Sequence, residues 1–373
     1  MSRFQRVFSV LIAGLAVFSF SAATGHATDL LDGINLPDGF KIKVFAKVPW
    51  ARSLAIDPAT NIVYVGSRQA QIHSVLDADG DGFAEKVELR ADNLAVPNGV
   101  AIHGGHLFIA LQDQLVKWRL PQTAMMTEPM DQLQTVYSGF PDRRHHGWRY
   151  AKFSPDGQLY VAIGAPCNIC LTRGLEGTIV RINPDDGALL TVAHGVRNSV
   201  GFDWHPKTGQ FFFTDNGADG MGDDIPPDEF NRLDHEGEHF GFPWRGGNNI
   251  RLNGFQRRQP PGPVSAPVLN FTAHAAALGV HFYRGSMFPE SYRGSAFVAQ
   301  HGSWNRSKKS GYRIMRIIFD AAGQVVDKVV FADGWLDGQR TLGRPVDITE
   351  TADGALLVSD DYTGLIYRIS YQP

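Results

Sequence analysis

Short runs of alternating apolar and polar residues recur along most of the chain, each followed by turn-forming residues and a second apolar run. The repeated unit reads apolar, any residue, apolar, then Asp or His with Pro or Gly, then β-branched and aromatic residues. Alternation with a period of two, bounded by Gly, Asp and Pro, predicts β-hairpins. Five clear copies begin at Leu54, Val100, Ala151, Phe202 and Ile348, and a weaker sixth copy runs from Val280 to Val298.

The spacing of these copies indicates how they assemble. Successive turns at Pro58, Gly105, Gly157 and Gly209 lie 47, 52 and 52 residues apart, and the later gaps widen to 85 and 60. A period of this length matches one four-stranded propeller blade. Because helical periodicity is lacking beyond short turns, the pattern weighs against an α/β enzyme. The sequence therefore predicts an all-β, six-bladed β-propeller.

Residues 28–373 are expected to form this propeller as a single domain. We expect residues 40–45 to pair with the last blade, because the ring would otherwise end in two open strand edges. The Pro- and Gly-rich interval 221–277 is where extended loops over one face are expected. Ligands bind in the channel and upper loops of propellers, so functional residues should come from several blades at once.

The first residues have the pattern of a secretory leader, predicted over residues 1–27. Arg3 and Arg6 precede an almost wholly apolar run, and small residues stand just before Thr28. A membrane anchor is the alternative, although an apolar run of roughly 14 residues is short for one. The sequence thus predicts a periplasmic or secreted protein without stable membrane insertion.

Composition and charge limit the function classes. Apolar residues make up 43% of the chain, which allows a large core, and 35 basic against 38 acidic residues give a net charge of −3. The sequence has no basic stripe of the kind found in nucleic-acid-binding proteins. The two cysteines, Cys167 and Cys170, are spaced as a CxxC pair, which in an exported protein most often closes a small loop as a disulfide.

Six short motifs stand out on the loops and strands of the repeat, at residues 177–183, 195–202, 214–217, 222–231, 240–243 and 301–306. Together they resemble the soluble quinoprotein sugar dehydrogenases, especially their sorbosone dehydrogenase-like branch. The resemblance extends from about residue 97 to residue 369, and no single motif carries it alone. It implies an oxidoreductase that uses pyrroloquinoline quinone (PQQ) and Ca²⁺ to oxidise an aldose or sorbosone-type sugar and passes electrons to an external acceptor.

The resemblance also implies roles for individual residues. His146 coincides with the family's catalytic histidine, and an imidazole suits the removal of a hydroxyl proton; His145 is a possible substitute, and a histidine packed in a loop is the plain alternative. Arg197 and Asn198 match a quinone-contacting pair, and Arg344 matches a carboxylate-binding arginine. Guanidinium groups are suited to bind the three carboxylates of PQQ. The alternative is that these arginines only pair with acidic residues and so hold neighbouring blades together.

Two further groups of residues are candidates for the cofactor and its metal. Gly217 and Ala218 stand where the family turns two carbonyls towards Ca²⁺, which favours hard oxygen ligands. Ala218 replaces the proline of the glucose-oxidising members. From the segment 301–309, Trp304 could stack on a planar ring and Arg306 could supply positive charge, but this match is weaker.

A separate signal for a metal ion lies nearer the N-terminus. Asp77, Asp79, Asp81, Glu85 and Glu88 stand at positions 1, 3, 5, 9 and 12 of a segment with glycine at position 6, which fits a calcium loop. Without flanking helices it would be a structural site between strands, with a metal-free polar hairpin as the alternative.

Two other functions stay open on the sequence alone. One is a calcium-dependent lactonase-type propeller, a hydrolase that would need acidic and amide side chains converging on one ion. The other is a non-catalytic binding propeller. Because the residues beside the base differ from those of glucose-oxidising members, the substrate also stays open among aldoses, ketoses, aldehydic sugars and other polyols.

Overall fold

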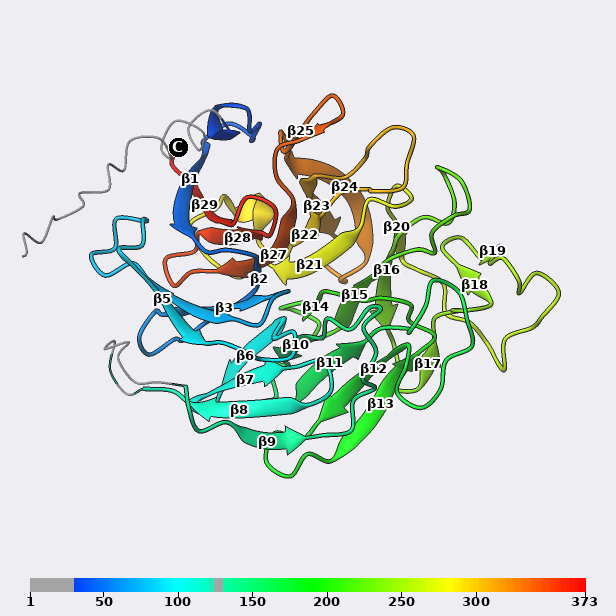
Figure 1. The fold of residues 1–373 in the computed structure, drawn as a ribbon. Helices are drawn as coiled ribbons and strands as arrows, with labels where there is room; N and C mark the ends of the chain where they lie inside the picture. Colours follow the sequence, from blue (N-terminus) through cyan, green and yellow to red (C-terminus); the bar gives the residue numbers. More distant parts are fainter. Residues whose placement is uncertain (1–29, 122, 124–129) are drawn as a thin grey trace, which may run out of the picture.

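Six β-sheets surround a common centre in the computed structural model of this protein (Figure 1). The structure describes residues 30–121, 123 and 130–373. The chain is nearly all β, with a short 3-10 turn, η1, at Glu290–Tyr292. This confirms the predicted six-bladed β-propeller. The predicted leader, residues 1–27, lies outside the described residues.

The strands of each blade pair antiparallel and the first strand lies innermost, except that the added fifth strand of the third blade pairs parallel with its neighbour. Strand order follows the sequence in all but the last blade. The first and second blades contain β2 (Ala51–Ile56), β3 (Val63–Ser67), β4 (Ile72–Leu76), β5 (Lys86–Ala91), β6 (Gly99–His103), β7 (His106–Ala110), β8 (Leu115–Arg119) and β9 (Gln134–Tyr137). The third and fourth contain β10 (Tyr150–Phe153), β11 (Leu159–Ile163), β12 (Thr178–Ile182), β13 (Leu189–His194), β17 (Glu238–His239), β14 (Phe202–Trp204), β15 (Phe211–Asp215), β16 (Glu229–Leu233) and β20 (Leu269–Asn270). The fifth and sixth contain β21 (Ala277–Phe282), β22 (Ala296–Gln300), β23 (Arg313–Phe319), β24 (Val325–Ala332), β27 (Pro345–Glu350), β28 (Leu356–Asp360), β29 (Leu365–Tyr371) and β1 (Phe40–Lys47).

The ring closes as the sequence predicts. β1, near the start of the described chain, pairs antiparallel with β29 at its end, with Phe40 opposite Tyr371 and Lys47 opposite Leu365. In Figure 1 the blue strand β1 accordingly lies beside the red strand β29. The edge of β29 that would otherwise be open is thereby paired, and β1 becomes the outermost strand of the sixth blade.

The interval 221–277 is less loop-like than the sequence suggests. β16 is the third strand of the fourth blade and β20 its fourth, so strands interrupt the expected loops. Between them a small hairpin, β18 (Arg245–Gly246) with β19 (Ile250–Arg251), projects from the propeller (Figure 1). A second small hairpin, β25 (Leu336–Asp337) with β26 (Arg340–Thr341), precedes the sixth blade.

The core lies between neighbouring blades and is rich in aromatic side chains. Phe212 and Phe230 of the fourth blade and Phe282 of the fifth are fully buried in one cluster, with ring centroids 5.4 and 5.5 Å from that of Phe212. Such contacts add roughly 0.5–1.5 kcal/mol per pair to the free energy gained by burial of area. Within the described ranges, no helix has the length and apolar character needed to span a membrane.

Aspartates on the innermost strands join neighbouring blades around the centre. Asp203 in β14 accepts a hydrogen bond of 2.8 Å from the Phe282 backbone N–H in β21. Asp347 in β27 accepts one of 3.0 Å from the Leu54 N–H in β2. Because each carboxylate satisfies a backbone donor of the next blade, these two positions fix the relative register of the inner strands.

Candidate active site

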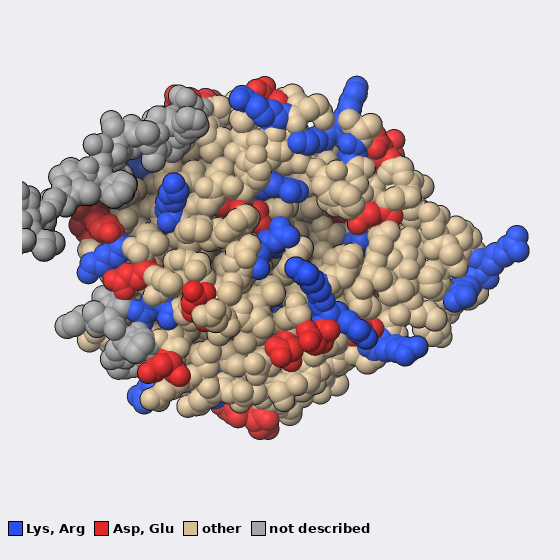
Figure 2. All heavy atoms as spheres, viewed as in Figure 1, with Lys and Arg blue, Asp and Glu red and all other residues tan. Residues whose placement is uncertain are grey.

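Loops from every blade converge on one cavity of about 630 Å³. Its walls carry more positive than negative side chains, and Figure 2 shows several Lys and Arg side chains gathered around the middle of one face. The charged and histidine residues that line it are Arg52, Arg68, Arg144, His145, His146, Arg197, Asp219, Asp228, His274, His301 and Arg344. Five arginines against two aspartates make this cavity suited to a polyanionic ligand.

His146 is held in the tautomer that a general base requires. Its Nδ1 lies 2.9 Å from the Ala165 carbonyl oxygen, so Nδ1 carries the proton and donates, leaving the Nε2 lone pair free. His146 adopts φ of 49°, and a Cβ on Gly164 would lie 2.5 Å from the His146 Cβ. The loop therefore comes this close to β11 only because residue 164 is glycine.

The surroundings of His146 keep it neutral. Burial lowers its pKa well below 6.5, and the positive charges of Arg197 and His145 lower it further. The His145 ring lies beside it, with centroids 4.1 Å apart, and its own pKa is lowered by partial burial. A neutral imidazole with a free Nε2 is poised to accept a proton at neutral pH.

Arg197 and Asn198 lie in the cavity wall, as the sequence predicts. The backbone N–H groups of both residues donate to the Asp215 carboxylate, at 2.7 and 2.6 Å, which fixes the turn after β13. The Arg197 guanidinium donates to the Asn216 carbonyl at 3.1 Å and to Asp219 at 2.9 Å. Within the described chain, the Asn198 side-chain amide makes no hydrogen bond, so it is free to meet a ligand.

A buried carboxyl pair lies behind this wall. Asp215 in β15 and Glu229 in β16 are directly opposite each other in the sheet. Burial raises the pKa of both groups, and their mutual repulsion adds to it for Glu229. Asp215 accepts two backbone N–H bonds, whereas Glu229 accepts one backbone N–H bond and one bond from the Asn231 side chain. The positive charge of Arg197 also favours the ionised form of Asp215, so Asp215 is the member that ionises first.

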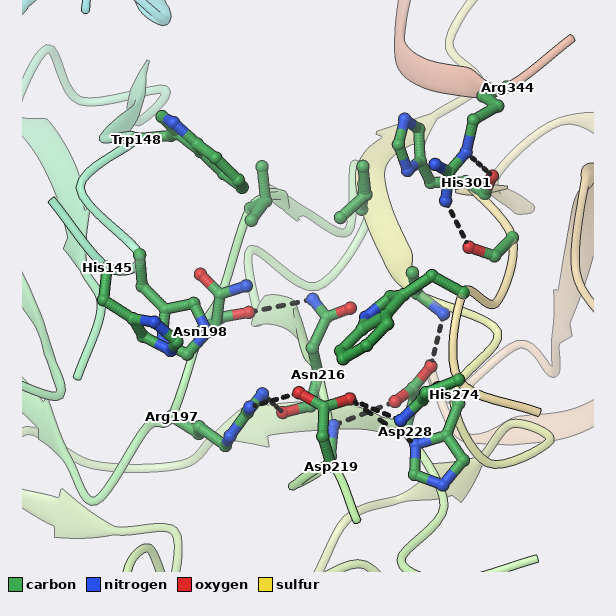
Figure 3. Close-up of a pocket in the computed structure, with 18 of the residues that line it drawn as sticks. His145, Trp148, Arg197, Asn198, Asn216, Asp219, Asp228, His274, His301 and Arg344 are labelled. Carbon is green, nitrogen blue, oxygen red and sulfur yellow. Dashed lines mark hydrogen bonds and ion pairs between the residues drawn. The ribbon is translucent and has the colours of Figure 1, made fainter. Parts of the chain in front are cut away.

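Arg344 enters the cavity from the side opposite Arg197 (Figure 3). It donates to the carbonyl oxygens of His301 and Gly302 at 3.0 and 2.6 Å. Among the described residues no carboxylate pairs with it. Its charge is thus available to an anion, and the alternative that Arg344 only locks blades through an acidic partner finds no support.

The structure adds residues that sequence reasoning missed. Arg52 donates to Asp361 at 2.7 Å, and His301 Nε2 lies 2.7 Å from the other oxygen of the same carboxylate. Arg68 stacks over the Trp148 ring at 4.1 Å. Arg52 and Arg68 stand at the two ends of a predicted hairpin, at the start of β2 and just after β3. Their position beside the repeat was the one signal in the sequence that marked them.

Gly217 and Ala218 follow β15 at the cavity wall. Gly217 lines the cavity, and its N–H donates to Asp228 at 2.8 Å, while Ala218 is buried among Phe242 and Leu252. The carbonyl oxygens of Gly217 and Ala218 accept no hydrogen bond from the described part of the chain. Burial raises the pKa of Asp228 to about 6. Unpaired carbonyls of this kind fit a hard cation.

The structure separates the two candidates from the segment 301–309. Trp304 lines the cavity with its side chain 75% exposed, so it stands at the mouth rather than in the core. Arg306 does not line the cavity. Its guanidinium binds the Asp223 and Ala273 carbonyl oxygens, which ties the 222–224 loop to the fifth blade.

The candidate calcium loop lies outside the cavity lining. One carboxylate oxygen from each of Asp77, Asp79, Asp81 and Glu85 lies within 4.8 Å of the others. Glu88 instead lies in β5, with its carboxylate 3.6 Å from Arg90. The structure thus groups Glu85, and not Glu88, with the three aspartates, and the metal ion itself stays a prediction. The predicted disulfide between Cys167 and Cys170 is confirmed.

The model of the family described as domain of unknown function (DUF7133) matches residues 58–370. The chain belongs to this family. An uncharacterised protein of Borreliella burgdorferi is 34% identical to it over 369 residues, which cover 95% of this chain and 96% of the relative. The match thus extends over nearly the whole length of both sequences.

Solved structures show the same fold at low sequence identity. The holo form of the pyranose dehydrogenase PQQ domain from Coprinopsis cinerea is 17% identical, with a TM-score of 0.74 over 90% of this chain and 97% of that chain. The calcium structure of the Trichoderma reesei carbohydrate-active enzyme of family AA12 is 19% identical, with a TM-score of 0.76 over 91% and 97%. At these identities the similarity establishes only that this DUF7133 member has the propeller fold.

Proposed function

We propose that this protein is a PQQ-dependent oxidoreductase that oxidises a sugar or a sugar-derived alcohol or aldehyde. The main support is that five arginines from several blades line one cavity together with the neutral base His146. A cavity of about 630 Å³ has the size of a cofactor site. The neighbours' names, a PQQ domain and a calcium structure, agree with this chemistry.

The residues present fit both implied groups. Arg344, which has no carboxylate partner in the described chain, and Arg197 with Asn198 would hold the acid groups of PQQ from two sides. The unpaired carbonyls of Gly217 and Ala218 would hold Ca²⁺. When bound, PQQ supplies a hydride acceptor and Ca²⁺ polarises it.

The chain itself supplies proton transfer and orientation. His146 Nε2 takes the proton of the substrate hydroxyl, while the Nδ1–H bond to the Ala165 carbonyl fixes the ring orientation. Trp304 at the mouth offers an exposed aromatic face against which a sugar ring can stack. The substrate would therefore lie between Trp304 and His146.

We also propose that the protein acts outside the cytoplasm, in the periplasm or secreted, and passes electrons to an external acceptor. The leader pattern of residues 1–27 and the Cys167–Cys170 disulfide support export.

Reconstitution tests the proposed function. Protein stripped with EGTA should bind added PQQ in the presence of Ca²⁺, seen as a change in the absorption spectrum. It should then reduce a redox dye when given members of an aldose, ketose and polyol panel. Lactone hydrolysis without dye reduction would establish the lactonase alternative, and absence of any spectral change would favour the binding propeller.

A pair of arginine variants sharpens this test. Arg344→Gln removes a guanidinium that has no carboxylate partner in the described chain, so PQQ affinity should fall at least about tenfold. Arg340→Gln is the control, because Arg340 is exposed in β26 and forms its ion pair with Asp337 alone among the described residues. Equal loss in both variants would mean that general surface charge, and not the cavity, holds the quinone.

The state of His146 gives a prediction for pH. Because burial and neighbouring cations lower its pKa, the ring stays neutral from neutral pH down to below 6.5 and protonates only as the pH falls further. Histidine NMR of the ligand-free protein should show several imidazoles that titrate below 6.5, those of His239 and His301 among them, and the resonance that His146→Asn removes should be one that titrates well below that value. A His146 resonance that titrates at or above 6.5 would contradict the neutral-base assignment.

A further inference from the structure

Asn168, which lies between the two disulfide-bonded cysteines, is the residue that holds Arg197 most extensively. Its backbone carbonyl accepts from Arg197 Nε at 3.0 Å, and its side-chain Oδ1 accepts from a terminal Arg197 nitrogen at 2.9 Å. With the bonds to Asn216 and Asp219, four of the five guanidinium N–H donors are engaged. Two of these four bonds depend on one residue.

The same asparagine also fixes the acidic partner of Arg197. Asn168 Oδ1 accepts from the Asp219 backbone N–H at 2.8 Å, and its Nδ2 donates to the Asp219 carbonyl at 2.8 Å. Asp219 in turn receives a bond of 2.8 Å from Asn305 in the fifth blade. Figure 3 shows Arg197 and Asp219 meeting at one wall of the cavity. Asn168 therefore sets the geometry of both charges.

The Cys167–Cys170 disulfide constrains the position of Asn168. The segment 166–171 contains no strand or helix, so its backbone is not held by a ladder of hydrogen bonds. The disulfide closes it into a small ring, and Cys167 and Ile169 pack against the cluster that contains Ala218. A covalent ring reduces the number of conformations that such a loop can adopt.

We propose that Asn168 is a positioning residue for Arg197, and that reductive opening of the disulfide releases it and weakens the binding of a polyanion in the cavity. In that step dithiothreitol gives two electrons and two protons. The S–S bond breaks, Cys167 and Cys170 become thiols, and the reagent closes to its own cyclic disulfide. The identity of the polyanion as PQQ rests on the proposed function, whereas the positioning of Arg197 does not.

The reactivity of Arg197 tests the positioning directly in the full chain. Phenylglyoxal modifies accessible guanidinium groups, and peptide mass mapping reports the rate at Arg197. In the unmodified protein Arg197 is 4% exposed and should react slowly. We expect Asn168→Ala, and the unmodified protein after dithiothreitol, to react about tenfold faster at Arg197, because two charge-assisted bonds are lost.

Two further variants separate positioning from a general loss of structure. Asn168→Asp keeps an Oδ1 acceptor for Arg197 and for the Asp219 N–H but loses the Nδ2 donor to the Asp219 carbonyl, so Arg197 should be modified more slowly than in Asn168→Ala. Leu171→Ala changes an exposed side chain next to the disulfide and should match the unmodified protein. If Asn168→Ala fails to fold, the dithiothreitol arm carries the test. An unchanged Arg197 rate in that arm overturns the proposal.

Quinone affinity is the second measurement. Titration of PQQ with Ca²⁺, followed by tryptophan fluorescence, should give about tenfold weaker binding for Asn168→Ala and for the reduced protein. Faster Arg197 modification with unchanged PQQ affinity would overturn the link between positioning and binding. If the unmodified protein itself binds no PQQ, the proposed function fails, and the modification rates alone decide the role of Asn168.

Discussion

The His146→Asn variant is expected to lose sugar-driven dye reduction by a factor of about 10² to 10⁴, the range typical for removal of a general base. Asparagine has no basic ring nitrogen to take the proton, but its side-chain NH₂ group can still donate towards the Ala165 carbonyl that anchors the histidine. Binding of PQQ should be almost unchanged, because the arginines on both sides of the cavity remain. The loss should therefore appear in kcat, measured by steady-state kinetics on the reconstituted enzyme.

His145→Asn is the matched control for this prediction. Its ring lies 4.1 Å from that of His146, so the two variants change neighbouring, chemically identical groups. Of these two histidines, His146 is the one whose ring forms a hydrogen bond with a backbone carbonyl among the described residues. A loss below about tenfold is expected for His145→Asn. A larger loss of activity in His145→Asn than in His146→Asn would instead assign the role of general base to His145.

The hairpin repeat predicts the fold well because its inner three strands are buried on both faces. Strands such as β11 and β12 therefore carry the Val, Ile and aromatic residues that sequence patterns detect. The outermost strands are the part that the pattern misses. β24 is largely exposed along its length and β5 partly so, and neither alternates clearly. The sixth copy is weak because η1 and its flanking loop separate β21 from β22.

The candidate site is predictable where a motif is local and not where partners are distant. Arg197 and Asn198 lie together after one strand, and the structure brings both into the cavity. His301 and Asp361 stand 60 residues apart, and only the closed ring brings them to 2.7 Å. Arg306 is the opposite case. It is two residues from Trp304, yet the loop turns its guanidinium towards the Asp223 carbonyl and away from the cavity.

Asp203 carries the largest expected effect on stability. Its carboxylate is buried in β14, where Lys152 Nζ lies 3.2 Å away and Arg284 donates to both of its oxygens at 2.9 Å. The Phe282 N–H of the next blade also donates to it. Asp203→Ala leaves two cations and a backbone donor without their partner. Lys152 and Arg284 are 26% and 38% exposed, so water can partly solvate the charges left behind, and the free energy of unfolding from urea titration should fall by about 3 kcal/mol.

The pH dependence of this contribution has a definite sign. Burial alone would raise the pKa of Asp203, but Lys152 and Arg284 outweigh it and hold that pKa well below 3.8. Because the folded pKa is lowered, the stabilisation is present above pH 3.8 and is lost as the pH falls through the folded value. Asp131→Ala, an exposed position, serves as the control. The free energies of unfolding of Asp203→Ala and Asp131→Ala should converge as the pH falls from 5 to 3. If their difference grew instead, an ionised Asp203 that joins the blades would be contradicted.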